Sequence, residues 1–269
     1  MQASNSTSSP GIRPTARCVI LGAGISSRLR PITDDIPKCL VRVGEKTLLQ
    51  RTYENLRAVG IRDIAVVVGY KRDAVRVFLK SIVPPMRVRL LVNPKFDSTN
   101  NAFSLLLARD FYRGPESTRG ARPPLLFMDG DILFSPLLLT RLIEESNGSA
   151  VAVRVSGPHD DEEVSVSVAG GNVIRMIGKN LPRQQNLGES VGIHLFAPPD
   201  AELLFKTLER RVRDGDGRTE YYESAIQEMI GGGTVIRAVD TSEFPAAEID
   251  TPEDLAYAEE KILPLLRHA

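Results

Sequence analysis

A glycine-containing loop directly after an apolar run constrains the fold of this chain more than any other stretch. Residues 18–21 are apolar, and Gly22 and Gly24 follow them. An apolar run of this kind predicts a buried strand, and glycines let the backbone take positive φ and pass close to a ligand. Amide groups of such a loop, where a short helix begins, bind oxyanions. The stretch therefore predicts an anion site at the end of a buried strand.

Cationic side chains distinguish between two kinds of phosphate ligand that would suit this loop. The glycines only half match a dinucleotide fingerprint, because Ser27 stands where a third glycine is required. Backbone groups and a helix end hold most of a dinucleotide's pyrophosphate, whereas a triphosphate needs side-chain cations as well. Arg28 lies inside the loop, and Lys38 follows a proline that restricts its approach. The pattern favours a nucleoside triphosphate.

The same stretch resembles the signature of the nucleotidylyltransferases, which join a nucleotide to a phosphorylated sugar or alcohol and release pyrophosphate. The matching residues are Gly22, Gly24, Arg28, Pro31, Pro37, Lys38 and Leu40. The resemblance implies that Arg28 and Lys38 hold the triphosphate and act in catalysis. It also implies a nucleotide-binding loop that contains Leu21, Gly22, Ala23, Gly24 and Ser27.

Composition indicates a globular protein without the overall positive potential that would attract polyanions. The 269 residues are 42% hydrophobic, and 34 Lys and Arg balance 34 Asp and Glu. This balance argues against nucleic acid as a partner. Three scattered histidines and two cysteines in apolar surroundings form no zinc motif, and no segment has the length of a membrane span. We expect a cytoplasmic protein without membrane insertion, and a homodimer is left open.

Apolar runs alternate with helical periodicity along most of the chain, which is typical of a parallel sheet. Strands are expected at 61–68, 88–92, 149–155 and 188–198, and helices at 46–59, 72–82, 199–213 and 219–230. Residues 164–168 and 173–177 alternate about a glycine turn, which predicts an antiparallel pair. The expected fold is α/β, a Rossmann-like, mostly parallel sheet with helices on both faces and a small antiparallel substrate-binding excursion. Residues 1–15 are expected to be a disordered tail, and 16–265 a single nucleotidylyltransferase domain.

Two adjacent asparagines before a predicted helix are candidates for contact with the base. A helix cap accounts for one of the two amides but not for both. In the nucleotidylyltransferases this place contacts the base, and Asn100, Asn101 and Ser104 stand in an NNxxSL pattern similar to the branch that uses CTP. That branch includes the phosphocholine, aminoethylphosphonate and inositol phosphate cytidylyltransferases. An amide can donate to and accept from a pyrimidine edge. Tyr70, at a strand end, is placed near the nucleotide or over the next helix.

Carboxylates from two distant parts of the chain point to magnesium. Asp129 and Asp131 follow an apolar run, and hard oxygen ligands suit Mg²⁺, although aspartates are also common in turns. Asp250 stands immediately before a strong helix start. The resemblance implies that Asp131 and Asp250 bind Mg²⁺, with Glu248 as a further candidate, and that Asp129 contributes to the nucleotide site.

The second substrate is expected to be a small phosphate or phosphonate. The resemblance places its phosphate on Lys179, although a lone lysine is most often solvated. The acceptor site is expected to include Lys179, Glu189, Tyr221 and Glu248, with Tyr221 alternatively in the core. A phosphate monoester has its second pKa near 6, roughly, so it attacks the α-phosphorus of CTP without a general base. Since the chain has no tryptophan for an ammonium cage, phosphocholine is disfavoured, and 2-aminoethylphosphonate or 2-hydroxyethylphosphonate is favoured.

Two other functions remain open from the sequence. A sugar-1-phosphate nucleotidylyltransferase using UTP, dTTP or GTP belongs to the same reaction class. A nucleotide-sensing regulatory subunit belongs to a different class, and such a protein is expected to lose the cations or the metal carboxylates. This chain keeps Arg28, Lys38, Asp131 and Asp250. The sequence therefore favours an enzyme that transfers CMP and releases pyrophosphate.

Overall fold

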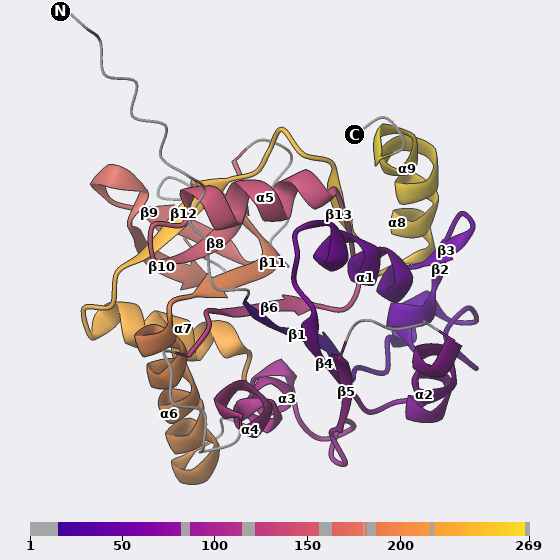
Figure 1. The fold of residues 1–269 in the computed structure, drawn as a ribbon, viewed down its shortest axis with the longest axis horizontal. Helices are drawn as coiled ribbons and strands as arrows, with labels where there is room; N and C mark the ends of the chain where they lie inside the picture. The colour runs from indigo at the N-terminus through magenta and orange to yellow at the C-terminus, as the bar shows by residue number, and fades with distance from the viewer. Residues whose placement is uncertain are drawn as a thin grey trace, which may run out of the picture.

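The computed structural model describes residues 16–81, 87–114, 122–155, 163–179, 181, 187–215 and 218–266. The disordered tail predicted for residues 1–15 lies outside the described residues. The described helices and strands surround one central sheet, and the carboxyl-terminal helices lie beside the hairpin of β2 (Arg42–Val43) and β3 (Lys46–Thr47) (Figure 1). No described helix is both long and apolar enough to cross a membrane.

A mixed nine-stranded sheet forms the centre of the molecule. Its strands are β1 (Arg17–Gly22), β4 (Asp63–Val68), β5 (Arg87–Val92), β6 (Leu125–Asp129), β8 (Ser149–Arg154), β9 (Ser165–Val168), β10 (Ile174–Gly178), β11 (Gly188–Phe196) and β12 (Ile236–Asp240). Strands β6, β1, β4 and β5 pair in parallel, and β12 pairs with β8 in parallel. Strand β11 runs antiparallel to β6, β8 and β9, and β9 and β10 form an antiparallel pair. The predicted α/β fold with an antiparallel excursion is confirmed.

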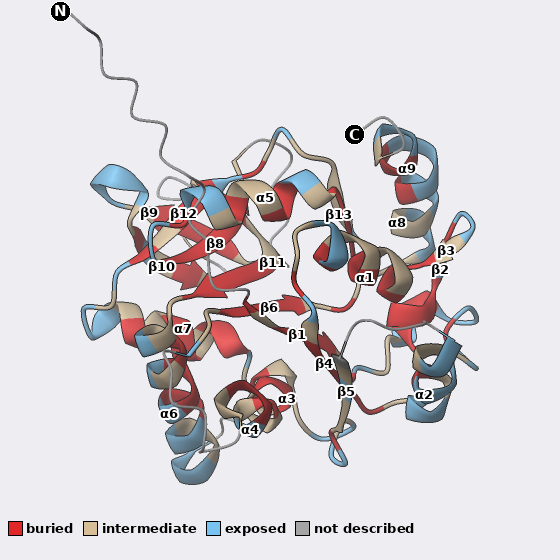
Figure 2. Ribbon diagram, in the orientation of Figure 1, coloured by how far each residue is buried: buried red, intermediate tan, exposed pale blue. Residues whose placement is uncertain are grey.

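Helices cover both faces of the sheet, which explains why its central strands are apolar along their whole length. In β1, Val19 and Leu21 join the core on one face, whereas Cys18 and Ile20 join the core on the other. Figure 2 shows the central strands buried. The first core is covered by α3 (Asn101–Leu107), α4 (Arg109–Arg113), α6 (Pro198–Asp214) and α7 (Tyr222–Gly231). The second is covered by α1 (Leu48–Ala58), α2 (Arg72–Ser81) and α5 (Pro136–Glu145).

A third, smaller core attaches the end of the chain to the glycine loop. Helices α8 (Pro252–Tyr257) and α9 (Leu263–Leu266) are joined by a π-helical turn, residues 258–262. Ala258 and Leu263 from this segment pack with Leu29 and Val41. Strand β13 (Ala246–Glu248) pairs with β7 (Ile132–Phe134) beside them. The packing therefore brings residues near 250 to the loop that follows β1.

Two predicted helix starts were wrong by two or three residues. The helix expected from residue 46 begins at Leu48, because β3 (Lys46–Thr47) first pairs with β2 (Arg42–Val43). Thr47 then caps α1 by accepting a hydrogen bond from the amide of Gln50. The helix expected from residue 219 begins at Tyr222, which sequence periodicity does not mark.

A buried histidine in β11 gives the fold a pH-dependent stability. His194 is fully buried and stacks on Phe127 at 4.6 Å, and neither ring nitrogen has a hydrogen-bond partner among the described residues. Burial lowers the pKa of His194 to about 3. Below about pH 6.5 the unfolded chain takes up a proton that the native protein does not, so stability falls as pH falls.

We expect wild-type protein to lose about 2 kcal/mol of unfolding free energy through His194 between pH 7 and pH 5. His194→Phe should remove that contribution, because phenylalanine fills the same space without a titrating nitrogen. Urea unfolding of both proteins at the two pH values measures the difference. An unchanged pH dependence in the variant would contradict this account of His194.

Candidate active site

One cavity of about 760 Å³ gathers most of the predicted site residues. It extends from the glycine loop to the antiparallel part of the sheet. The predicted residues that line it are Leu21, Ala23, Gly24, Arg28, Asn100, Asn101, Ser104, Asp129, Asp131, Lys179, Glu189, Tyr221, Glu248 and Asp250. Among the predicted residues, Gly22, Ser27, Lys38 and Tyr70 are not in its lining. The tertiary structure therefore joins segments separated by more than two hundred residues.

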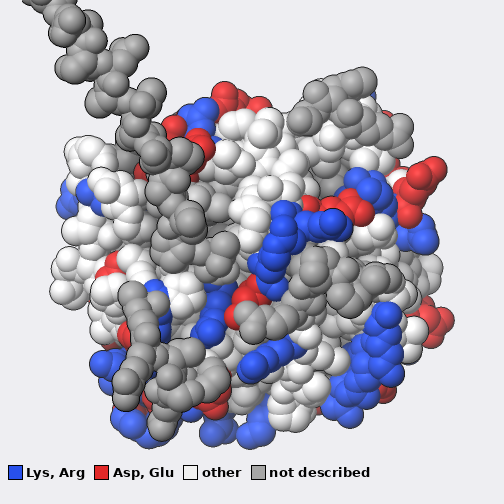
Figure 3. Space-filling view, viewed as in Figure 1, with Lys and Arg blue, Asp and Glu red and all other residues white. Residues whose placement is uncertain are grey.

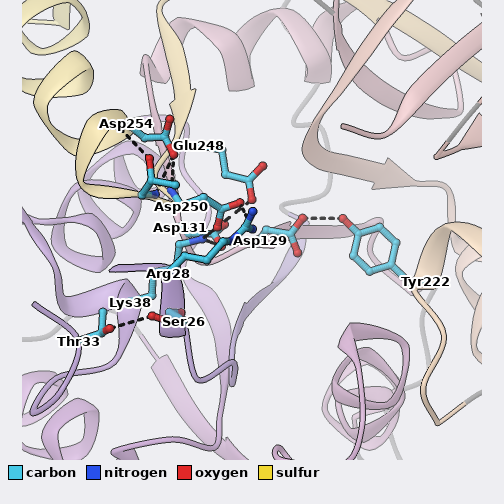
Figure 4. Close-up of polar contacts among 11 residues, drawn as sticks. Ser26, Arg28, Thr33, Lys38, Asp129, Asp131, Tyr222, Glu248, Asp250 and Asp254 are labelled. Atoms are coloured by element: carbon cyan, nitrogen blue, oxygen red, sulfur yellow. Dashed lines mark hydrogen bonds and ion pairs between the residues drawn. The ribbon is translucent and has the colours of Figure 1, made fainter. Parts of the chain in front are cut away.

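In the glycine loop, the residue with a positive φ angle is not one of the glycines that were expected to have it. The positive φ, 56°, belongs to Ser26 and not to Gly22 or Gly24, so that part of the prediction was wrong. Gly22 is instead closely packed, because a Cβ there would lie 3.3 Å from the Sγ atom of Cys39. A Cβ on Gly24 would meet no atom within 4 Å, so this glycine leaves open space beside the loop. Thr33 steadies the turn by donating to the carbonyl of Ser26 at 2.8 Å (Figure 4).

Three carboxylates meet beside the loop. Asp131, Glu248 and Asp250 each offer an oxygen, and these oxygens lie within 4.8 Å of one another. The β7–β13 pairing and a hydrogen bond from the amide of Ile249 to the carbonyl of Asp131, 3.1 Å long, bring the two segments together. Asp254 accepts hydrogen bonds from the backbone amide of Asp250 and from that of the next residue, which starts α8 with a capping box. Secondary structure therefore positions all three groups.

Two cations lie beside these three carboxylates and offset much of their negative charge (Figure 4). The Nζ atom of Lys38 lies 2.6 Å from Asp131 and also bonds to Asp250, and Arg28 lies 2.6 Å from Asp250. Burial lowers the pKa of Lys38, but the charges of Asp131, Asp250 and Glu248 more than offset it, so that pKa is raised overall. The negative charge of Asp131 is the main cause that raises the pKa of Glu248 to about 8, although the Glu248 side chain is 59% exposed. The carboxylates repel one another and require positive charge.

The three carboxylates of Asp131, Glu248 and Asp250 together have the chemistry of a divalent metal site. The Oδ1 atom of Asp131 is buried and has no hydrogen-bond partner in the described part of the chain. A buried carboxylate oxygen without a partner needs an explanation, and hard oxygen donors are what Mg²⁺ or Ca²⁺ prefers. Asp131, Glu248 and Asp250, with oxygens within 4.8 Å of one another, fit such an ion.

Asp129, predicted to bind nucleotide, has a structural partner within the protein. Its Oδ2 atom accepts a hydrogen bond from the hydroxyl of Tyr222 at 2.7 Å. Burial first, and the charge of Asp131 second, raise the pKa of Asp129 well above its usual range.

The turn after Asp129 approaches β1 closely, since a Cβ on Gly130 would lie 2.7 Å from the carbonyl oxygen of Leu21. Only glycine fits at that position.

Both asparagines before α3 also have structural partners. Asn100 caps α3 by accepting from the amide of Asn101 at 2.8 Å. Asn101 accepts from the backbone amide of Tyr222 at 2.9 Å, which ties α3 to the start of α7. The expectation that a structural role explains only one amide was therefore wrong. Ser104 accepts a hydrogen bond from buried Asn93.

Tyr70 supports the glycine loop and does not line the cavity. Its hydroxyl donates to the carbonyl of Asp34 at 2.8 Å, and its amide donates to the carbonyl of Ala23 at 3.2 Å. Its ring lies near that of Phe96, at 6.4 Å between centroids. The tyrosine thus acts on the loop from outside the cavity.

The far end of the cavity contains the predicted Lys179 together with residues that the sequence did not reveal. Lys179 is exposed, with its Nζ atom 4.9 Å from the ring centroid of Tyr221. Arg154 lies 2.7 Å from buried Glu189 and 3.2 Å from Glu163. Arg154, Glu163 and Glu223 were not predicted, since each occupies a position in the sequence that ordinary surface residues also fill.

Comparison with known protein families decides the family of this chain. The model of the MobA-like NTP transferase domain matches residues 18–213. The chain belongs to this family. The predicted membership of the nucleotidylyltransferase superfamily is confirmed. The matched residues include the glycine loop, Asp129, Asp131 and Lys179.

Relatives and solved structures agree with this assignment. The CMP-5'-(3-aminopropyl)phosphonate synthase of Streptomyces rubellomurinus is 29% identical over 92% of this MobA-like chain and 39% of its own length. A bifunctional IPC transferase and DIPP synthase of Rubrobacter xylanophilus is 32% identical over 94% of the chain and 54% of its own length. The chain thus spans about half, or less, of these relatives. The structure of CTP:phosphocholine cytidylyltransferase from Streptococcus pneumoniae shares the fold, with a TM-score of 0.71, 22% identity, and coverage of 91% and 98% of the two chains.

The surface shows no single-signed basic face in the view of Figure 3, where basic and acidic side chains are interspersed. The arginines near the end of α6 are paired: Arg210 and Arg211 both contact Glu228 of α7. These pairs indicate that the arginines belong to a solvated face with balanced charge.

Proposed function

We propose that this chain is a cytidylyltransferase that transfers CMP from CTP to a small phosphate or phosphonate acceptor and releases pyrophosphate. The favoured acceptors are 2-aminoethylphosphonate and 2-hydroxyethylphosphonate. The observation that carries the proposal is the cavity in which the glycine loop, the carboxylates with their two cations, and Lys179 meet. The Streptomyces relative, whose name gives a CMP-phosphonate as its product, supports CTP and a phosphonate.

The nucleotide would occupy the loop end of the cavity. Gly24 leaves room for phosphate oxygens, and Arg28 lines the cavity beside it, where its guanidinium would bind these oxygens. Lys38 lies behind the cavity lining, against Asp131 and Asp250, and would add positive charge from there. Asn100 and Asn101 line the same end, and their oxygens keep their structural hydrogen bonds. The NH₂ group of Asn100 also donates to the carbonyl of Thr219 at 3.4 Å, so its second N–H and the NH₂ group of Asn101 would donate to the base.

Magnesium would be held by Asp131, Asp250 and Glu248. When bound, it would neutralise the phosphate charge that accumulates at the reacting phosphorus. The protein's own contribution is to fix the three carboxylates through β7, β13 and the start of α8. Lys38 and Arg28, which pair with these carboxylates, are placed to take the charge of the departing pyrophosphate.

The acceptor would enter from the end that contains Lys179. A phosphate or phosphonate oxygen is already ionised near neutral pH, so the protein needs no general base for this step. Lys179 would bind the acceptor's oxygens and hold one of them in line with the α-phosphorus of CTP. The barrier then falls through positioning and charge neutralisation, as in other phosphoryl transfers.

Pyrophosphate release tests the proposal directly. The full chain is assayed with magnesium and each of CTP, UTP, dTTP, GTP and ATP. Each nucleotide is crossed with 2-aminoethylphosphonate, 2-hydroxyethylphosphonate, phosphocholine, inositol phosphate and glucose 1-phosphate. We expect release with CTP and a small phosphonate.

Two other results would replace the proposal. Release with a sugar phosphate and another nucleotide would assign the sugar-1-phosphate branch, within the same reaction class. Nucleotide binding without release for any acceptor would favour the regulatory subunit. A single domain over residues 16–265, a cytoplasmic location and a homodimer stay predictions that these assays do not address.

A further inference from the structure

A buried glutamate at the start of α7 has an atom that the rest of the protein leaves unsatisfied. Glu223 is only 6% exposed, yet it lines the cavity. Its Oε2 atom is buried and makes no hydrogen bond to any residue that the structure describes. The positive end of α7 stabilises the carboxylate in part. A buried carboxylate oxygen without a donor is nevertheless costly, so a donor on a ligand is the simplest partner.

The cations at this end of the cavity do not supply that donor. Arg154 is engaged by Glu163 and Glu189. Lys179 lies over the ring of Tyr221, where it acts on Glu223 through its charge but makes no hydrogen bond to it that the structure records. Burial raises the pKa of Glu223 to about 7, and the backbone amide of Glu223 itself, then the charge of Lys179, oppose part of that rise. Glu223 is therefore close to a cation without being neutralised by it.

Three carboxyl groups and two cations line this end of the cavity: Glu163, Glu189 and Glu223, with Arg154 and Lys179. Burial, and then a hydrogen bond with Glu189, raise the pKa of Glu163 to about 8, and Arg154 contacts both of these glutamates. Glu223 and Lys179 are therefore left to meet a ligand. An acceptor with an ammonium group a few bonds from its phosphonate matches both, because the ammonium meets a carboxylate while the phosphonate meets a lysine.

We propose that the acceptor carries a primary amine, that Glu223 binds its ammonium group, and that Lys179 binds its phosphonate or phosphate oxygens. This inference rests on the proposed function and narrows it to amino-phosphonates or amino-phosphates. Glu223 is then the residue that selects an amine over a hydroxyl. An ammonium donates to the Oε2 atom and also neutralises its charge, whereas a hydroxyl only donates.

Equilibrium binding tests the inference separately from turnover. The full chain, with magnesium and α,β-methylene-CTP, which cannot transfer CMP, is titrated with 2-aminoethylphosphonate, 2-hydroxyethylphosphonate and ethylphosphonate in a calorimeter. We expect the amine to bind at least tenfold more tightly than the hydroxyl compound. In Glu223→Gln this preference should fall to less than threefold, while binding of 2-hydroxyethylphosphonate changes little. Glu223→Asp, which keeps the charge, should retain a preference for the amine.

Glu228→Gln is the matched control, since Glu228 lies on the same helix, contacts Arg210 and Arg211, and is outside the cavity lining. It should keep the wild-type preference. Equal binding of amine and hydroxyl compounds by wild-type protein, or an amine preference that survives Glu223→Gln, would overturn the inference. So would equal weakening of all three ligands, which indicates a structural role. Amine-selective binding without pyrophosphate release would support the role of Glu223 and count against the proposed reaction alone.

Discussion

Asp131→Asn is expected to lower the rate of pyrophosphate release about a thousandfold, on the order of 4 kcal/mol in the barrier. Asp131 contributes a buried Oδ1 atom that has no donor among the described residues, and it stands within 4.8 Å of the oxygens of Glu248 and Asp250. An amide in its place removes a charged ligand atom at the point where phosphate charge must be neutralised. Steady-state assays with CTP and the best acceptor measure the loss.

The substitution should leave the protein folded, because the Asp131 backbone carbonyl still accepts from the amide of Ile249. Calorimetry should show that Asp131→Asn binds Mg²⁺ at least tenfold more weakly than wild-type protein, which tests the metal site without turnover. Asp110→Asn is the control, since Asp110 is exposed and pairs with Arg109 far from the cavity. Wild-type turnover by Asp131→Asn would remove this residue from the metal site.

Lys38→Met is expected to lower the free energy of unfolding by about 3–5 kcal/mol, the loss typical when one partner of a buried ion pair is removed. Lys38 is 9% exposed and contacts both Asp131 and Asp250. Methionine keeps the apolar stem but leaves two close carboxylates without their common cation. Urea unfolding at neutral pH measures the change.

Added Mg²⁺ should restore part of the stability of Lys38→Met, because an ion that binds only the folded protein stabilises it. Lys46→Met is the comparison: Lys46 is partly exposed and pairs with Glu54, so its loss should cost less than about 1 kcal/mol. If both variants lose the same small amount, Lys38 does not have the electrostatic role assigned to it here.

Local patterns in the sequence were sufficient for the framework of the fold. The apolar run at residues 18–21 became the middle of β1, buried on both faces, because a strand in a covered parallel sheet has no polar side. The start of α8 was equally readable, since Thr251 and Asp254 make a capping box within a single turn. Both features depend on neighbours only a few residues apart.

The pairing of the charged groups was not readable in the same way. The sequence assigned Lys38 to the triphosphate and Asp131 and Asp250 to a metal, and the structure adds that Lys38 bridges the two aspartates across 93 and 212 residues of chain. Likewise, Asn101 was assigned to the base, but its amide oxygen holds the amide of Tyr222, 121 residues away. The type of each residue indicated which chemistry its side chain can perform. Only the fold showed which groups that side chain contacts.

The sequence by itself predicted most strands of the sheet, although not β12, and a loop suited to an anion, because apolar periodicity, glycines and helix caps act over short distances in the chain. Only the tertiary structure decided which polar groups meet in the cavity. Glu223 illustrates the difference: in the sequence it is one acidic residue in an ordinary helical pattern, and in the fold it is a buried carboxylate with an oxygen that lacks a donor among the described residues. Burial and distant partners arise from the packing of whole elements, which no short stretch of sequence contains.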